Sequence, residues 1–451
     1  MERLPFIVIG LSFLQGALTP AQFNNMTMIA TAVVLGSKFS LTEISLMWMN
    51  ERCVSTLSHF LSDAKFCTLE MQNHYILRTH SLYKIKGGYF IIDDTMKHHT
   101  KLCQWIHGVC VLFDHAMNTN LKAICLVVLY YSDGCIIKFP IKFAIYYQKN
   151  SENKKILPWR RHKEYVWKPK YDLAIEMIEW AIKKDFPACT VLADSWFGIG
   201  PFIKKLRKLN LNYVLEIKNS YNVKSPCETP RLKKNGKLTK NQFDLTNITQ
   251  YFSKIQSVVK YGFSYDKKKG KKAKTLYHVK AVRGYLNSIP GKHYIIESFD
   301  PAKKTVKYLL TNELTWEPSK IITTYSCRWV IEEFFRNAKQ LSDMEGITIR
   351  SEQGITVSLC LVFWIDFLLH YENYKQSTAE ELPKEPLTIP SIIRQAQCEN
   401  MESFIEKVQN DEEFVARWIE AQKKGIEKKR KMLKELVKIE ESNDIEVDMA
   451  A

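Results

Sequence analysis

Between residues 86 and 220, short apolar runs alternate with two amphipathic patterns, and this order constrains the fold more than any other feature of the chain. Runs rich in β-branched and aromatic residues come first, followed by a helix, a strand, a second helix and a strand. This order predicts an α/β architecture, a mixed sheet with helices packed on it. The expected strands are YFIIDD, GVCVLFDH, KAICLVVLYY, CIIKFPIKFAIYY, ACTVLADS and NYVLEIK, and the expected helices are YDLAIEMIEWAIKKD and PFIKKLRKLN.

The segment YSCRWVIEEFFRNAK, residues 325–339, predicts an amphipathic helix with its charges on one side. At about 100° per residue, five side chains share one narrow stripe. They are Tyr325, Arg328, Glu332, Arg336 and Lys339. The opposite face is apolar and wide enough for core packing. Taken alone, the stripe is explained by a solvated face with Arg328–Glu332 and Glu332–Arg336 ion pairs.

Positive charge is concentrated in the chain, which predicts an acidic partner. The 451 residues carry a formal net charge of +17. The excess gathers in three blocks, at residues 154–163, 231–240 and 267–274. Trp159, Tyr165 and Trp167 accompany the first block, as stacking platforms often do in nucleic-acid sites. Charge and aromatic residues together favour nucleic acid over an anionic membrane surface.

The 11 cysteines form no Cys-x-x-Cys pair, which suits a reducing cytoplasm better than a disulfide scaffold. One cluster has residue types that bind zinc: His98, His99, Cys103, His107 and Cys110. It offers no clear fourth ligand at tetrahedral spacing, so reduced, semi-buried side chains are the simpler interpretation.

The N-terminal run LPFIVIGLSFLQGAL is apolar enough to resemble part of a signal peptide. It lacks a basic leader and a clean cleavage site, and it is too short to span a bilayer, so we expect a core helix. No later stretch reaches about 18 uncharged apolar residues, and we therefore predict no membrane span.

Two aspartates follow apolar strands of the expected sheet: Asp94 in YFIIDDT and Asp194 in TVLADSWFG. A carboxylate directly after a buried strand is held rigidly at the edge of the sheet, where α/β sheets bind ligands. With Glu332 they would supply hard oxygen ligands for two Mg²⁺ ions about 3.5–4 Å apart. Because such a site performs phosphodiester chemistry, the charged stripe at 325–339 is better explained as part of it than as a solvated face.

Neighbouring acids need separate arguments. Glu333 adjoins Glu332 but lies about 100° farther round the helix, away from the charged stripe, so the register favours Glu332. Asp93 and Asp94 point to opposite faces of one strand, and since both faces are apolar the alternation does not choose between them. Asp133, in the sequence SDGC, suits a tight hairpin turn and is not a candidate acid.

The spacing Tyr325-x2-Arg328-x3-Glu332-x6-Lys339 resembles the Tyr-Arg-Glu-Lys signature of a group of bacterial insertion-sequence DDE transposases. The blocks IIDDT and VLADSWFG are similar to the first and second catalytic blocks of that group, and the similarity covers roughly residues 86–375. Trp196 departs from the pattern, since small or acidic residues are frequent there. Packing beside the sheet is its simpler interpretation, and stacking on a base is the alternative.

The resemblance implies a role for each matching residue. The implied catalytic residues and metal ligands are Asp94, Asp194 and Glu332, with two Mg²⁺ ions for which Mn²⁺ would substitute. The implied DNA-binding residues, at phosphates near the cleaved end, are Tyr325, Arg328 and Lys339. The family pattern has an aspartate directly before a threonine, so it selects Asp94, and Asp93 becomes an accessory ligand or a neighbour of the site.

The resemblance also implies a ribonuclease H-like core interrupted by a β-rich insertion, which carries the strand patterns TLYHVKAVRGYL, KHYIIESF and TVKYLLTN. We expect five segments. They are an N-terminal helical DNA-binding domain at 1–85, the first part of the core at 86–220, the basic insertion at 221–316, the second part of the core at 317–375, and C-terminal helices with an acidic tail, suited to dimerisation, at 376–451.

The implied function is that of a DNA transposase, which cuts at the ends of an insertion sequence and joins the 3′ ends to target DNA. Its partners would be double-stranded DNA and a second copy of the chain, without a membrane, in the bacterial cytoplasm at the nucleoid. A domesticated DDE-type nuclease and an inactive DNA-binding remnant are the alternatives. Intact Asp94, Asp194 and Glu332 argue against the remnant.

Overall fold

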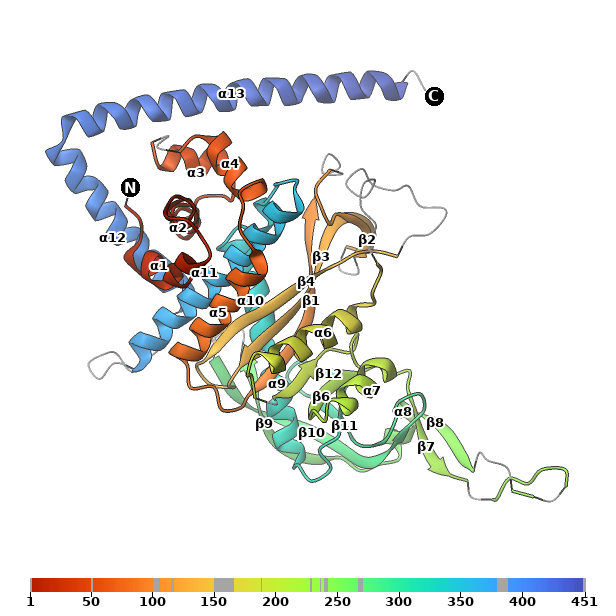
Figure 1. Cartoon of the computed structure of the whole chain (residues 1–451). Helices are drawn as coiled ribbons and strands as arrows, with labels where there is room; N and C mark the ends of the chain where they lie inside the picture. Colours follow the sequence, from red (N-terminus) through yellow and green to blue (C-terminus); the bar gives the residue numbers. More distant parts are fainter. Residues whose placement is uncertain are drawn as a thin grey trace. The chain divides into compact units, whose positions relative to one another are not determined.

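A computed structural model describes the chain in two units, shown in Figure 1. Residues Ile76–Arg336 form the first, called the sheet unit below, and Met1–Tyr75 with Asn337–Ala451 form the second, the helical unit. The described residues are 2–49, 52–99, 105–114, 117–149, 166–187, 189–227, 229–235, 237–238, 242–266, 271–378 and 388–448. Cys103, Trp159, Tyr165 and the whole 154–163 block lie outside them. The functions expected for the separate segments stay predictions.

Five strands form the centre of the sheet unit, in the order β4–β3–β1–β5–β6. Strand β3 is antiparallel to β1 and β4, whereas β1, β5 and β6 are parallel. Parallel neighbours need a crossover, and helices α6 and α7 lie in the connections before and after β5. The bounds are β1 (Tyr89–His99), β3 (Thr119–Ser132), β4 (Lys138–Tyr146), β5 (Thr190–Ala193), β6 (Tyr213–Ile217), α6 (Lys170–Lys183) and α7 (Gly200–Lys208). The predicted α/β fold class is confirmed, and the arrangement is consistent with a ribonuclease H-like core.

Strand β3 shows why the apolar runs become the middle of the sheet. Every residue from Ala123 to Ser132 is buried. Helix α6 contacts this strand, and the Phe334 ring packs against Tyr130 with the ring centres 5.3 Å apart. Strand β2 (Cys110–Asp114) pairs with the first residues of β3. The predicted hairpin turn between β3 and β4 is confirmed: Gly134 has φ +83°, and the Asp133 carboxylate accepts the backbone N–H of Cys135.

The strands of the insertion extend the core sheet. Strand β12 pairs antiparallel with β6, and the order continues through β11, β10, β7 and β8, with β9 paired to β10. This pairing supplies hydrogen-bond partners to β6, which would otherwise be an exposed edge. The bounds are β7 (Asn222–Pro226), β8 (Phe243–Asn247), α8 (Ile248–Ser253), β9 (Val258–Asp266), β10 (Lys271–Leu286), β11 (Lys292–Asp300) and β12 (Thr305–Thr311).

The single helix predicted over residues 325–339 is wrong at its first turn. The chain forms α9 (Pro318–Ser326) and α10 (Trp329–Gln340), with a tight turn between them. There Arg328 N–H donates to the Tyr325 carbonyl and Ile331 N–H to that of Arg328, which are three-residue bonds. Such a turn advances each residue by about 120° instead of 100°, so the stripe is broken between Tyr325 and Glu332. The apolar face of α10 is confirmed, since Ile331, Phe334 and Ala338 are buried.

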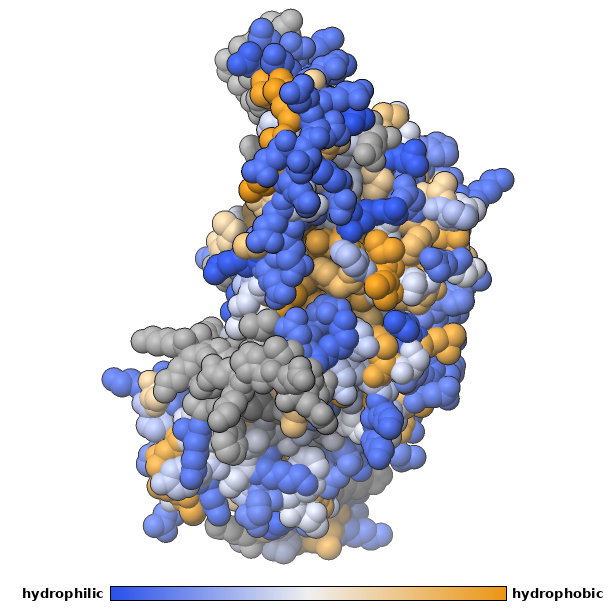
Figure 2. Space-filling view, turned by 90° about the vertical axis from the view of Figure 1, so that its left-hand side faces the viewer, coloured by the Kyte–Doolittle hydropathy of each residue, from blue (hydrophilic) through white to orange (hydrophobic). Residues whose placement is uncertain are grey.

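The helical unit is organised around α11 (Glu352–Thr378), which contacts α1, α2, α4 and α12. The expected N-terminal core helix is confirmed, because Ile7, Leu11 and Leu14 are fully buried. The other helices are α1 (Pro5–Gly10), η1 (Leu11–Gly16), α2 (Pro20–Val34), α3 (Leu41–Met47), α4 (Val54–Ser62), η3 (Met344–Gly346), α12 (Ile389–Asn410) and α13 (Glu412–Asp448). Helix α5 (Thr68–Leu82) belongs to both units. In the view of Figure 2, apolar side chains form separate patches on a mostly hydrophilic surface.

By length and composition, one helix among the described residues is apolar enough to cross a membrane, the stretch Glu352–Gln376 of α11. However, 89% of its apolar window is buried, and the core helix of a helical domain has the same character. Trp364 of this helix packs against Phe13 and Tyr75 of the same unit.

Gly198 provides a test of how tightly the loop after β5 packs on β6. A Cβ atom at this position would lie 2.0 Å from the backbone oxygen of Glu216. We expect Gly198→Ala to reduce the free energy of unfolding by about 2 kcal/mol, because the clash is with backbone. Gly284→Ala is the control, since its Cβ would meet nothing within 4 Å. Equal stability of the two variants in calorimetry would contradict this packing.

Candidate active site

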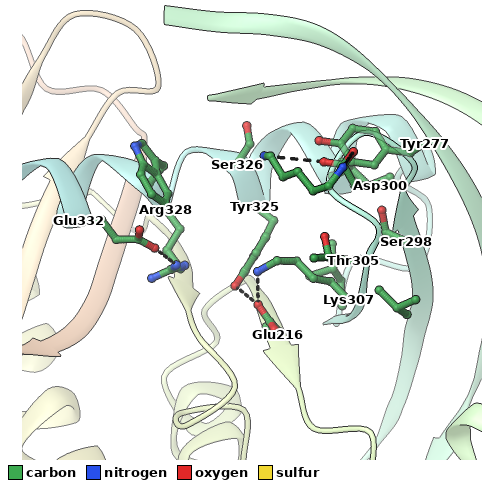
Figure 3. Close-up of a pocket in the computed structure, with 15 residues that line it drawn as sticks. Glu216, Tyr277, Ser298, Asp300, Thr305, Lys307, Tyr325, Ser326, Arg328 and Glu332 are labelled. Atoms are coloured by element: carbon green, nitrogen blue, oxygen red, sulfur yellow. Dashed lines mark hydrogen bonds and ion pairs between the residues drawn. The ribbon is translucent and has the colours of Figure 1, made fainter. Parts of the chain in front are cut away.

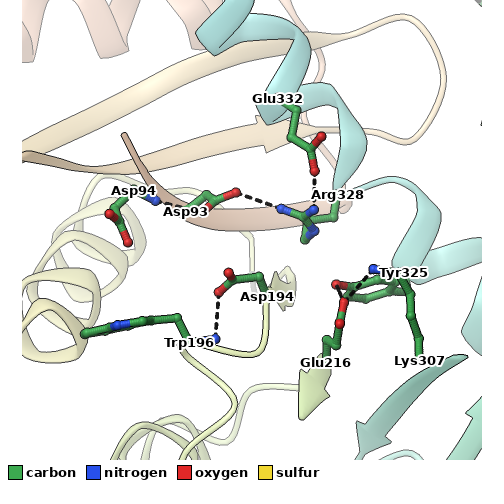
Figure 4. A network of polar contacts seen from close by, with 9 residues as sticks. All are labelled: Asp93, Asp94, Asp194, Trp196, Glu216, Lys307, Tyr325, Arg328 and Glu332. Atoms are coloured by element: carbon green, nitrogen blue, oxygen red, sulfur yellow. Dashed lines mark hydrogen bonds and ion pairs between the residues drawn. The ribbon is translucent and has the colours of Figure 1, made fainter. Parts of the chain in front are cut away.

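The pairing of β1 with β5 decides which acids lie together. These strands are parallel, and the last pair in register is Ile92 with Ala193. Asp93 and Asp194 are the next residues on the two strands. Because paired residues of parallel strands point to the same face of the sheet, their carboxylates lie on one side. In Figure 4 both lie near Arg328, whereas Asp94 points away from it.

Arg328 joins the first and third acids. Its Nη1 donates to Asp93 Oδ2 at 2.7 Å, and its Nη2 forms an ion pair with Glu332. The Arg328 side chain is 11% exposed and that of Asp93 15%, so this contact lies in a largely water-excluded place. Of the two ion pairs in the solvated-face interpretation, Arg328–Glu332 is present, whereas Arg336 lies 3.9 Å from Glu333.

The carboxylates are in an environment that disfavours their charge. Burial raises the pKa of Asp93 to about 7; the Arg328 guanidinium opposes this rise, and the charges of Asp194 and Asp94 add to it. Burial also raises the pKa of Asp194, against Arg328 and the backbone N–H of Trp196. A divalent cation would hold such carboxylates in the charged form.

Asp94 occupies the other face of β1. Its Oδ2 accepts a hydrogen bond from Lys170 Nζ at 2.8 Å, and the Cys125 thiol lies 3.6 Å from the same oxygen. The sequence pattern assigns the main role to Asp94 and a secondary role to Asp93. In the structure, however, Asp93 shares Arg328 with Glu332. This placement follows from the register between β1 and β5, which the sequence alone does not reveal.

Tyr325 belongs to a second polar group, which sequence reasoning missed. Its side chain is 7% exposed, and its hydroxyl donates to Glu216 Oε2 at 2.6 Å. Lys307 Nζ donates to the same oxygen at 2.6 Å. These residues line a pocket of about 490 Å³ that also reaches Arg328 and Glu332 (Figure 3). The sequence gives no indication that Glu216 and Lys307 are in contact, because their contact depends on the pairing of β6 with β12.

The remaining charges of α10 have separate partners. Glu333 accepts from Lys138 Nζ of β4 at 2.8 Å, away from Arg328. Lys339 Nζ lies 3.6 Å from Glu345 within the helical unit, and its side chain is 28% exposed. The phosphate contact expected of Lys339 stays a prediction.

The donor set of the site fits a divalent cation of the magnesium type. Asp93, Asp194 and Glu332 offer only carboxylate oxygens, which hard cations prefer. Among the residues that the structure describes, no three histidine, cysteine or acidic side chains are close enough to hold a metal ion as they stand. At this site Asp93 and Glu332 are both in contact with the Arg328 guanidinium.

The suggested zinc cluster is only partly described. His98 Nε2 lies 2.7 Å from Asp114 Oδ2, and His107 Nε2 lies 2.9 Å from the Tyr147 hydroxyl. Burial lowers the pKa of His99 to about 3, and the neighbouring Lys97 contributes. The two hydrogen-bonded histidines therefore have other partners.

Comparison with protein families agrees with this geometry. The model of the DDE superfamily endonuclease family matches residues 12–254, more than half of the chain. The chain belongs to this family. A second model, the transposase DDE domain, matches residues 169–365. The first match includes Asp93, Asp94 and Asp194, and the second includes Asp194 and Glu332. None of the curated proteins matches the chain.

Membership makes this DDE endonuclease a metal-dependent DNA-cleaving enzyme of the nuclease or transposase kind, with DNA as its substrate. The families expected from the sequence and found by comparison agree at this level. The two matches share residues 169–254 of the sheet unit, from α6 to α8, which include Asp194.

The Arg328 ion pairs generate a stability prediction. Arg328→Gln would leave the buried Asp93 carboxylate without its cation, and we expect the metal-free protein to lose about 3 kcal/mol of unfolding free energy. Arg336→Gln is the control, since Arg336 is half-exposed and its loss is expected to cost under about 0.5 kcal/mol. Denaturant unfolding in EDTA measures both.

Addition of Mg²⁺ extends this test. A cation bound to the acids replaces the missing guanidinium, so Mg²⁺ is expected to stabilise Arg328→Gln more than the unsubstituted chain. If Arg328→Gln and Arg336→Gln unfold alike in EDTA, the ion pairs do not have this role.

Proposed function

We propose that this DDE endonuclease is a DNA transposase that cuts at the ends of a mobile element and joins the 3′ ends to target DNA. One observation carries the proposal: Asp93, Asp194 and Glu332, which are far apart in the sequence, lie around the single guanidinium of Arg328. Their order along the chain and their elements, two neighbouring strands and a helix, fit the acids of a DDE site.

We assign the first metal ligand to Asp93 rather than to Asp94. Asp93 is in register with Asp194 beyond the last β1–β5 pair, and it contacts Arg328. Asp94 binds Lys170 instead. When bound by the three acids, two Mg²⁺ ions, or Mn²⁺ in their place, would activate the attacking hydroxyl and stabilise the leaving oxygen.

Arg328 has two states in this proposal. Without cations its guanidinium offsets the negative charge of Asp93 and Glu332. If cations neutralised those carboxylates, the fork of Arg328 would be free to bind a phosphate of the DNA strand with two hydrogen bonds. Tyr325 helps to position the Arg328 guanidinium, which lies 5.9 Å from the centre of the Tyr325 ring. The Tyr325 hydroxyl is itself held by Glu216. Lys339 adds a point charge for a phosphate.

The substitution test uses DNA that carries the inverted repeats flanking the gene, with Mg²⁺ present and absent. We expect Asp93→Asn, Asp194→Asn and Glu332→Gln each to lower strand cleavage at least about a thousandfold while DNA binding persists, because each removes a metal ligand. Asp94→Asn is expected to retain most cleavage. Glu333→Gln is the control, since Glu333 pairs with Lys138.

The outcomes of that assay separate the assignments. Loss of cleavage in Asp94→Asn with activity kept in Asp93→Asn would reverse the choice of ligand. Cleavage without joining of 3′ ends would favour a nuclease over a transposase. In the same binding measurements, Lys339→Ala is expected to reduce the salt slope by about 1, the loss of one phosphate contact.

We also propose that the enzyme acts as a homodimer through α12. Cys398, Met401, Ile405 and Val408 occupy alternating three- and four-residue spacings on this helix, and all four are exposed. That spacing forms the seam of a coiled coil. Ile405→Glu is expected to convert a dimer into a monomer in sedimentation, and a monomeric unsubstituted chain would contradict this proposal. We further propose that the enzyme is located at the bacterial nucleoid, because DNA is its substrate. Microscopy of a fluorescent fusion would test this location.

A further inference from the structure

Trp196 lies beside the candidate site with part of its ring open to solvent. It is two residues after Asp194, and its backbone N–H donates to Asp194 Oδ1 at 3.0 Å. Its ring packs edge-on against the buried Phe197, with the ring centres 4.9 Å apart, yet Trp196 is 38% exposed. Trp196 therefore packs beside the sheet as expected, anchored by Phe197, but part of its ring remains accessible to solvent.

Lys170 continues this surface. Its ammonium group lies 5.0 Å from the centre of the Trp196 ring and 5.4 Å from that of Tyr146. The Asp94 carboxylate holds the ammonium group at 2.8 Å. Asp94 is the residue next to Asp93, so this ammonium group is held beside a proposed metal ligand.

Trp167 is linked to the same group through Tyr146. Its Nε1 donates to the Tyr146 hydroxyl at 3.3 Å, and Lys149 lies 5.4 Å from the centre of its ring. Trp167 is also 38% exposed. Trp196, Lys170, Tyr146 and Trp167 therefore form a continuous row, called the aromatic track below, that begins at Asp194.

We propose that the aromatic track binds unpaired nucleotides of the DNA strand that extends from the cleaved phosphate. A solvent-accessible indole offers stacking to any base, and Lys170 and Lys149, which lie over the rings, supply positive charge for the phosphates. Bases inside a duplex are already stacked on one another and cannot use these faces, so the track selects single-stranded DNA. Asp94 acts in this site as a positioning residue for Lys170.

This inference rests on the proposed function only in taking DNA as the substrate, and it names the part of the DNA that the site binds. It gives Asp94 a specific role, which is to position Lys170. It also assigns a role to the aromatic residue that departs from the pattern of the insertion-sequence transposases.

The test compares two fluorescein-labelled DNAs, a blunt duplex and the same duplex with an oligothymidine extension, in metal-free buffer that prevents cleavage. Fluorescence anisotropy is expected to show tighter binding of the extended DNA. Trp196→Ala, Trp167→Ala and Lys170→Met are each expected to weaken binding of the extended DNA about tenfold, with little effect on the blunt duplex. Asp94→Asn is expected to act in the same direction as Lys170→Met.

Trp180→Ala is the matched control. Lys142 of β4 lies 3.9 Å from the centre of the Trp180 ring on α6, so this pair joins the same strand and helix as Tyr146 and Lys170. It lies farther along α6, away from the acids, and its loss is expected to leave both affinities unchanged.

A fluorescent base, 2-aminopurine, placed in the extension reports stacking directly. Its emission is expected to be quenched by the unsubstituted chain and by Trp196→Phe, and not by Trp196→Ala. The inference is overturned if both tryptophan variants bind the extended DNA as the unsubstituted chain does, or if Trp180→Ala loses as much affinity. Failure of the proposed function, seen as absent Mg²⁺-dependent cleavage, leaves these binding differences measurable and so is distinguished from failure of the track.

Discussion

Burial of neighbouring carboxylates, whose charges also repel one another, is the main physical constraint at the centre of this sheet unit. Two parallel strands place Asp93 and Asp194 side by side, and α10 adds Glu332. Without compensation, acids this close and this well covered would resist charging. Arg328, in the turn between α9 and α10, opposes this effect in part through its contact with Asp93 at 2.7 Å. The same positive charge is what a phosphate needs, so one side chain serves both the metal-free and the DNA-bound protein in the proposed mechanism.

The β-rich insertion is part of this arrangement rather than an appendage. Because β12 pairs with β6, the core sheet and the insertion share one set of backbone hydrogen bonds. Lys307 of β12 and Tyr325 of α9 meet on Glu216 of β6, all within one polar group. The turn that carries Arg328 follows directly. A shift of the insertion strands would therefore also move the Arg328 guanidinium relative to the acids.

The two faces of β1 divide the chemistry of the site. One face presents Asp93 to Arg328, and the other presents Asp94 to Lys170. The first face is suited to holding cations, and the second fixes a lysine among aromatic rings. A pair of adjacent aspartates thus serves two neighbouring surfaces, because successive side chains of a strand point in opposite directions. In the proposed enzyme these surfaces contact the cleaved phosphate and the strand beyond it.

Local sequence patterns were sufficient to predict the strands and helices of the core, the hairpin turn at Asp133, the apolar face of α10 and the DDE family. These features depend on local patterns: apolar runs, helical spacing, turn residues and the distances between Tyr325, Arg328, Glu332 and Lys339 along the chain. Only the tertiary structure decided which of two adjacent aspartates faces the other acids. Both faces of β1 are buried, so alternation held no information, and the answer came from the register with β5. The break between α9 and α10 and the contact of Glu216 with Lys307 were decided in the same way, by packing and strand pairing between segments distant in sequence.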